Sequence, residues 1–170
     1  MWYLPESSSL TLQVRLSAFR AVCEYFIPAE AAQRTKMSSL VDPMLNVLPP
    51  LLADKNSADL IEALTSLIEV ATEHPKMFRH TFSHLVHFSI SLMKEKEMDD
   101  DARQAALELL ITFSEGAPVM CRKDQFYTIS TVEQILSFMC DHDDSAEALE
   151  EWRNTDDVYL PLARLIIVGL

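Results

Sequence analysis

Glycine is almost missing from this chain, whose 170 residues include only Gly116 and Gly169. Average usage of about 7% would give roughly a dozen glycines. Phosphate-binding loops, dinucleotide fingerprints and the nucleophile elbow of hydrolases need closely spaced glycines, because the backbone there must approach a ligand or adopt positive φ. The Asn-Gly and Asp-Gly pairs that mark tight hairpins are absent too. The sequence therefore predicts an all-α protein without a nucleotide-binding loop.

Cysteines and basic residues are also scarce. The three cysteines, Cys23, Cys121 and Cys140, are far apart and form no CxxC pair, which argues against a disulfide framework or a zinc site and favours a reducing compartment. The 14 Lys and Arg are outnumbered by 26 Asp and Glu, for a net charge of −12. Because nucleic acids are bound through clustered cations, this balance favours a basic protein partner instead.

Long apolar runs are absent as well. No stretch of 18 uncharged apolar residues occurs, and residues 1–10 have neither a basic start nor a continuous apolar core. We therefore expect no signal peptide, no membrane-spanning helix and no membrane partner.

An internal repeat organises the apolar residues. Residues 63–77 align without gaps with residues 106–120, with six of fifteen positions identical, all of them apolar. A fainter copy, Ala18-Phe19 with Val22 and Cys23, lies 45 residues before the first of these segments. A period of forty-odd residues is typical of helical repeats of the HEAT and armadillo kind.

Each repeat is predicted to be a pair of helices, in units covering residues 9–54, 57–95 and 99–140 after an N-terminal extension of residues 1–8. The first unit pairs a helix over 9–26 with one over 36–53 that is bent or broken around Pro43 and Pro49-Pro50. The second begins at a cap on Asn56 or Ser57, stops at Pro75 and continues as a helix over 76–94. The third begins at Asp99-Asp100-Asp101, ends near Gly116 and continues as a helix over 125–140 that carries the apolar residues Phe126, Ile129, Val132, Ile135, Leu136 and Met139.

The first helices of units two and three are apolar around more than one narrow stripe, so each needs cover on two sides. Stacked repeats supply that cover, because each pair buries its faces against its neighbours. We predict an α-solenoid of about three helix pairs; an irregular helical bundle with a chance repeat is the alternative.

Three histidines form the clearest candidate for metal binding. His80, His84 and His87 follow at i, i+4 and i+7, which would place them on one helical face. However, no carboxylate lies between Arg79 and Met93, and the HExxH arrangement is missing. A polar surface row on the second helix is the preferred interpretation, so we predict no metal and no other cofactor.

Nucleophilic catalysis has even less support. Ser83 and His84 are adjacent, and side chains at i and i+1 of a helix point about 100° apart. Cys121 precedes Arg122 and Lys123, a setting that could lower a thiol pKa, but no base or oxyanion donor accompanies it. We assign no catalytic residue and predict that the protein is not an enzyme.

A strongly acidic segment spans residues 141–157, with eight carboxylates against Arg153. Charge at this density predicts a loop, which could serve solubility alone or attract a basic partner over long range. Trp152 within it favours partner binding, because an aromatic side chain needs something to pack on. The residues proposed to bind the partner are Asp141, Asp143, Asp144, Glu147, Glu150, Glu151, Trp152, Asp156 and Asp157.

Several motifs together resemble the importin-beta superfamily of nuclear transport receptors (karyopherins), of the beta-3 type. They are residues 63–78, the sequence Ala-Leu-Glu-Leu-Leu-Ile-Thr-Phe-Ser-Glu over 106–115, Met120-Cys121-Arg122-Lys123, and the acidic run around Glu150-Glu151-Trp152. The resemblance covers about residues 10–157. It implies a right-handed superhelix of HEAT repeats that carries cargo through nuclear pores and releases it when Ran-GTP binds.

By that resemblance, the acidic segment would contact basic surfaces on Ran and on nuclear localisation signals. The second helices would line the groove, with His80, His84, His87 and Lys94 as exposed candidates, and nuclear pore proteins would be further partners. It also implies residence in cytoplasm and nucleus.

Family members are much longer, and the apolar tail of residues 158–170 would leave a solenoid face uncapped, so we expect a partial chain. The alternative function is a structural HEAT scaffold in a phosphatase or chromosome-associated assembly.

Overall fold

The computed structural model describes residues 7–140, which contain helices and no strand. In chain order the elements are α1 (Ser7–Phe26), α2 (Ala31–Met37), the 3₁₀ helix η1 (Ser38–Leu40), α3 (Val41–Leu45), α4 (Leu48–Ala53), α5 (Ser57–Glu73), the 3₁₀ helix η2 (Pro75–Phe78), α6 (Phe82–Lys94), α7 (Asp100–Gly116), α8 (Pro118–Lys123) and α9 (Gln125–Cys140). The chain divides into two compact units, residues 1–132 and 133–170, and the first contains every helix from α1 to α8 together with the start of α9.

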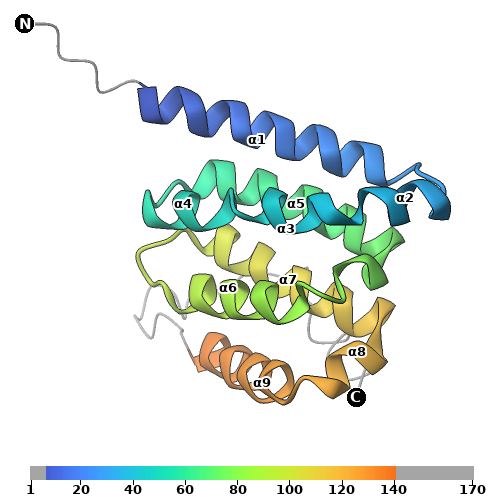
Figure 1. The fold of residues 1–170 in the computed structure, drawn as a ribbon. Coiled ribbons are helices and arrows are strands. Elements are labelled where there is room, and N and C mark those ends of the chain that lie inside the picture. Colours follow the sequence, from blue (N-terminus) through green and yellow to red (C-terminus); the bar gives the residue numbers. More distant parts are fainter. Residues whose placement is uncertain (1–6, 141–170) are drawn as a thin grey trace, which may run out of the picture. The chain divides into compact units, whose positions relative to one another are not determined.

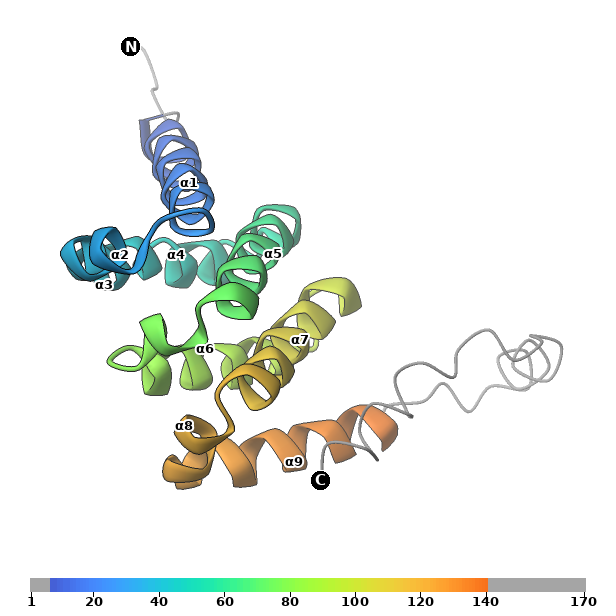
Figure 2. The same cartoon turned by 90° about the vertical axis from the view of Figure 1, so that its right-hand side faces the viewer.

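The helices of the first unit form two layers. The long helices α1, α5 and α7 lie side by side in one layer, with α5 in contact with both neighbours. The shorter helices α2, α3 and α4, followed by α6, form the second layer, where α4 packs on α5 and α6 packs on α7 (Figures 1 and 2). The prediction of an all-α solenoid of helix pairs is therefore confirmed.

Helix α5 is the centre of the core. Its start is capped as predicted, because the Asn56 side chain accepts a hydrogen bond from the Asp59 amide at 3.2 Å. Leu60, Leu64 and Leu67 are fully buried. A helix that buries this much of its surface needs a neighbour on each side, and α1 and α7 supply them.

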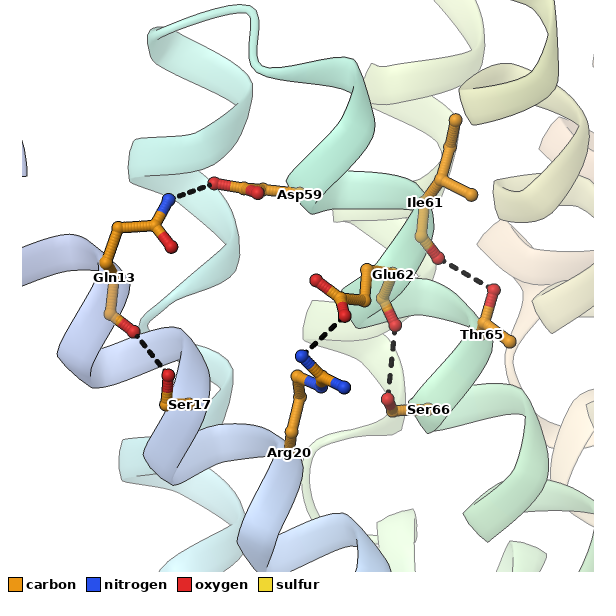
Figure 3. Close-up of polar contacts among 8 residues, drawn as sticks. All are labelled: Gln13, Ser17, Arg20, Asp59, Ile61, Glu62, Thr65 and Ser66. Carbon is orange, nitrogen blue, oxygen red and sulfur yellow. Dashed lines mark hydrogen bonds and ion pairs between the residues drawn. The ribbon is translucent and has the colours of Figure 1, made fainter.

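Polar contacts join α1 to α5 along their exposed edge (Figure 3). Gln13 Nε2 donates to Asp59 Oδ2 at 2.8 Å, and the Arg20 guanidinium pairs with the Glu62 carboxylate. Both partners of the ion pair are about half exposed, so it contributes little to stability, on the order of 0–1 kcal/mol. These contacts set the register of the two helices, while the buried apolar residues supply most of the stabilisation.

The second layer is interrupted in both of the first two repeats. The helix over 36–53 was predicted to be bent or broken around its prolines, and the segment is split into four pieces, with Pro43 inside the first turn of α3 and Pro49 and Pro50 inside that of α4. Proline is tolerated there because the first turn has no amide partner to lose. The segment begins earlier than predicted, at Ala31, and the prediction of one continuous helix over 76–94 is wrong, since η2 and a turn precede α6.

Candidate functional site

The acidic segment of residues 141–157 lies outside the described residues. This applies to all of its predicted contact residues, namely Asp141, Asp143, Asp144, Glu147, Glu150, Glu151, Trp152, Asp156 and Asp157. Their role as a binding segment stays a prediction that rests on charge. The groove candidates of the second layer lie within the described residues, and they define the candidate site.

The four groove candidates are exposed, but they do not share one helix. His84 and His87 lie on α6 and Lys94 ends it, whereas His80 lies in the turn before α6. The expected three-histidine helical face is therefore wrong, because the backbone bonds from Arg79 to Lys76 and from Thr81 to Phe78 close 3₁₀-type turns there. Within residues 7–140, no group of three or more His, Cys, Asp or Glu is arranged to hold a metal ion.

His87 forms the most ordered part of this surface. Its ring stacks on that of Phe126 in α9, with centroids 4.1 Å apart and planes 5° from parallel. Its Nδ1 lies 2.7 Å from the Ser83 carbonyl oxygen, which can only accept, so Nδ1 carries the hydrogen. Among residues 7–140, the Nε2 atom has no hydrogen-bond partner, so it can accept a hydrogen bond from a ligand.

The start of α9 holds Phe126 in place for this stack. The Asp124 carboxylate accepts from the Tyr127 amide at 3.1 Å and so caps the helix. The buried Tyr127 hydroxyl donates to the Leu110 carbonyl at 2.8 Å, and its ring packs against Phe82 of α6. Burial raises the pKa of Tyr127 well above its usual value, so the hydroxyl remains a donor at neutral pH.

A buried aromatic cluster packs against Tyr127 and so supports the start of α9. Phe113 of α7 is fully buried and meets the ring of Phe78 edge-on at 5.6 Å and that of Phe82 at 5.3 Å. The cluster links η2, α6 and α7 and, through Tyr127, the start of α9. The histidine–phenylalanine pair is thus mounted on packed core residues and does not depend on a loop for its position.

The surface around His87 carries no negative charge from α6, because residues 79–94 contain no Asp or Glu. His80, Ser83, His84, Ser91 and Lys94 are all exposed along this segment. Such a surface offers hydrogen bonds and an aromatic face to a partner. It does not offer the carboxylates that a basic peptide would need, and those are predicted to come from residues 141–157.

Cys121 does not fit the role of a nucleophile. It is buried, and burial raises the pKa of its thiol to about 11, an effect that the nearby Tyr127 hydroxyl only partly opposes. The thiolate is the reactive form, so the thiol is inert near neutral pH.

Phe126 is the surface residue that sequence reasoning missed. Helical spacing predicts it as one of the apolar residues of a packed helix, but it is 38% exposed, and Ile129 and Val132 of the first unit are also exposed. In their place Tyr127, Ser130 and Thr131 are buried. No signal in the sequence distinguishes the two sides of α9, because the buried side is the more polar one.

Two protein families match successive parts of the chain. Residues 6–88 match the family described as "IPO5-like, TPR repeats", and residues 95–159 match the family described as "Importin repeat". The chain belongs to the importin-beta (karyopherin) family, as the resemblance in its motifs predicted.

One relative is importin subunit beta-3 of Saccharomyces cerevisiae, which is 36% identical over 148 residues, 85% of this chain and 14% of that protein. The crystal structure of Kap121p bound to RanGTP superposes with a TM-score of 0.76 at 34% identity, covering 86% of this chain and 14% of that one. The karyopherin Kap121p bound to the SUMO protease Ulp1p gives a TM-score of 0.78 at 30% identity, covering 93% and 15%. The chain thus spans about a seventh of the length of these relatives.

Proposed function

We propose that this chain is a segment of a nuclear import receptor that takes part in binding import cargo and Ran-GTP. The observation that carries the proposal is the likeness to Kap121p, which has been crystallised with RanGTP, with Ulp1p and with Nup53p, over 86% or more of this chain. The proposed partners are Ran-GTP, basic cargo proteins with nuclear localisation signals, and nuclear pore proteins. The proposed location is cytoplasm and nucleus.

The proposed mechanism divides the work between two surfaces. The acidic segment attracts a basic partner over distances up to about 10 Å at moderate salt and speeds the encounter. The exposed face of α6, with His84 and His87, and the stacked Phe126 of α9 then supply short-range contacts that depend on fit. The relatives are transport receptors, and we propose that this chain likewise has no catalytic activity.

The first experiment removes the charge of the acidic segment without changing its shape. Replacing the eight acids between Asp141 and Asp157 with Asn and Gln should slow association with Ran-GTP and with a basic import-signal peptide by about tenfold or more at low salt. Surface plasmon resonance at several salt concentrations measures both the rate and its salt dependence.

A matched control neutralises exposed acids elsewhere on the chain. The control variant also changes eight acids, all of them exposed and outside residues 141–157: Glu24, Asp42, Asp54, Glu69, Asp101, Glu108, Glu115 and Glu133. If association slows equally in both variants, the rate depends on the net charge of the protein and not on the position of the acidic segment. Unchanged binding in the first variant at every salt concentration would refute a role for the acidic segment.

The second experiment tests the α6 surface. His87→Ala should weaken cargo binding by increasing the dissociation rate, because the stacked pair and its free Nε2 are lost. Ser91→Ala, an exposed change on the same helix, serves as the control. Equal dissociation rates for the two variants would refute the proposal that His87 contacts the cargo.

A further inference from the structure

A cavity lies where the turns between paired helices of neighbouring repeats come together. Its volume is about 430 Å³, within the range of about 300–1,000 Å³ found for small-ligand sites. Its lining residues are Arg34 of α2, residues 72–77 at the end of α5 and in η2, and Gly116 at the end of α7. All of them belong to the first unit, and none belongs to the α6 surface or the acidic segment.

Contacts between repeats hold the walls of this turn cavity. His74 Nε2 lies 3.1 Å from Arg34 Nη1 and 3.1 Å from the Ile27 carbonyl oxygen. Arg34 Nη1 also donates to the Ala29 carbonyl. The side chains of the first and second repeats are thus joined at the cavity, which orders the arginine before any ligand arrives.

The third repeat closes the other side. A Cβ added at Gly116 would lie 2.9 Å from Cγ of Pro75, which is too close for two carbon atoms. The absence of a side chain at Gly116 therefore allows the end of α7 to approach Pro75, and this approach shapes the cavity.

The lining combines positive charge with apolar surface. Arg34 and Lys76 are balanced only by Glu73, in a chain whose net charge is −12. Among residues 7–140, neither Arg34 Nε, Arg34 Nη2 nor Lys76 Nζ has a hydrogen bond or an ion pair. Pro75 and Met77 supply apolar wall, and the Thr72 hydroxyl is already bonded to the Ile68 carbonyl at 2.8 Å.

We infer that the turn cavity binds a short peptide segment of a partner protein in which an Asp or Glu stands next to an apolar residue. The carboxylate accepts hydrogen bonds from the unused donors of Arg34 and Lys76, which are strong because both partners are charged. The apolar side chain packs on Pro75 and Met77. A free phosphate would use the cations but leave the apolar wall exposed, so the chemistry favours a peptide.

This site selects the opposite charge from the one that the acidic segment attracts. A lysine-rich peptide is repelled by Arg34 and Lys76, whereas an acidic peptide finds two cations and one carboxylate in this lining, on a protein with a net charge of −12. The turn cavity would therefore recruit a second class of partner without competing for the surfaces proposed to bind basic cargo.

The test uses the chain with a fluorescein-labelled peptide, Ser-Asp-Leu-Ser-Asp-Leu, and fluorescence anisotropy at low salt. Replacing both Asp with Asn, or both Leu with Ser, should each weaken binding at least fivefold. Lys76→Gln should weaken binding of the parent peptide by about tenfold or more, the loss expected for one charge-assisted hydrogen bond. Lys123→Gln removes an exposed lysine outside the cavity and should leave binding unchanged.

Three results would overturn the inference: no binding of the parent peptide up to millimolar concentration, equal binding of the Asn peptide, or equal effects of Lys76→Gln and Lys123→Gln. Because Lys76 is exposed, its replacement should leave the thermal unfolding curve unchanged, and Arg34→Gln gives a second variant at the same site. Failure here leaves the proposed binding of Ran-GTP and basic cargo untouched, since those depend on other residues.

Discussion

Replacing Phe113 with alanine tests whether the aromatic cluster holds the second and third repeats together. Phe113 is fully buried in α7 and packs edge-on against Phe78 and Phe82. Its ring therefore connects the long-helix layer to both segments of the second layer of the preceding repeat. The substitution leaves a cavity between α7, η2 and α6, where the backbone of three elements limits how far the site can collapse.

The size of the effect follows from volume and from ring geometry. Buried Phe→Ala changes cost about 3–5 kcal/mol in unfolding free energy, and each edge-to-face pair adds about 0.5–1.5 kcal/mol beyond the buried area. We expect Phe113→Ala to lower the unfolding free energy by about 4 kcal/mol. Phe113→Leu keeps most of the volume and loses mainly the ring contacts, so it should cost about 1–2 kcal/mol.

Urea unfolding followed by circular dichroism at 222 nm measures these values, with Ile129→Ala as the control. Ile129 is a well-exposed apolar side chain on α9, and its replacement should stay within about 0.5 kcal/mol. A loss below about 1 kcal/mol for Phe113→Ala would refute the view that this cluster couples the repeats.

Three further predictions concern single groups. Arg103 is buried, donates through Nε to the Met93 carbonyl at 3.1 Å and pairs with Asp100, so Arg103→Ala should lower the unfolding free energy by about 2 kcal/mol in the same urea assay. Lys55 has a left-handed backbone with φ of 51°, so Lys55→Gly should raise the melting temperature, whereas Lys55→Ala should not. Burial raises the pKa of Cys23 to about 12 and that of Cys121 to about 11. Because the folded state holds these protons more tightly than the unfolded state, the two thiols should not change the stability below about pH 8. Each should lower the unfolding free energy by about 1–2 kcal/mol at pH 10, as measured by urea unfolding across that range.

Helix starts and stops were the most predictable part of the fold. Asn56 before an apolar run and Pro75 after it predicted α5, because capping and the missing proline amide act within a few residues of the chain. The predicted helix over 125–140 coincides with α9. These signals are local, so the rest of the fold cannot easily override them.

The second layer was less predictable, because its breaks depend on contacts that are distant in sequence. Phe78 must reach Phe113, and the chain from Pro75 to Thr81 takes tight 3₁₀-type turns to place it there. Apolar spacing alone cannot show this, since the same residues also fit one continuous helix. As a result, His80 lies in a turn and not on the same helical face as His84 and His87.

The sidedness of α9 was also hidden from the sequence. Helical spacing predicts that Phe126 and Ile129 are buried, but they are exposed. Tyr127 is buried instead, and its hydroxyl donates a hydrogen bond to the Leu110 carbonyl. The orientation goes with contacts that Tyr127 makes to two other helices, the hydrogen bond to Leu110 and the ring contact with Phe82, and no pattern within α9 encodes those partners.

The contrast between the two layers has a mechanical consequence. The rods of 20, 17 and 17 residues, α1, α5 and α7, resist bending along their length, whereas the opposite layer is interrupted within every repeat by a 3₁₀ turn or a short helix. When the solenoid bends, the backbone should therefore change mainly at those interruptions, while the long helices stay straight. Small adjustments at several interruptions would let the helix pairs change their spacing without unfolding any repeat.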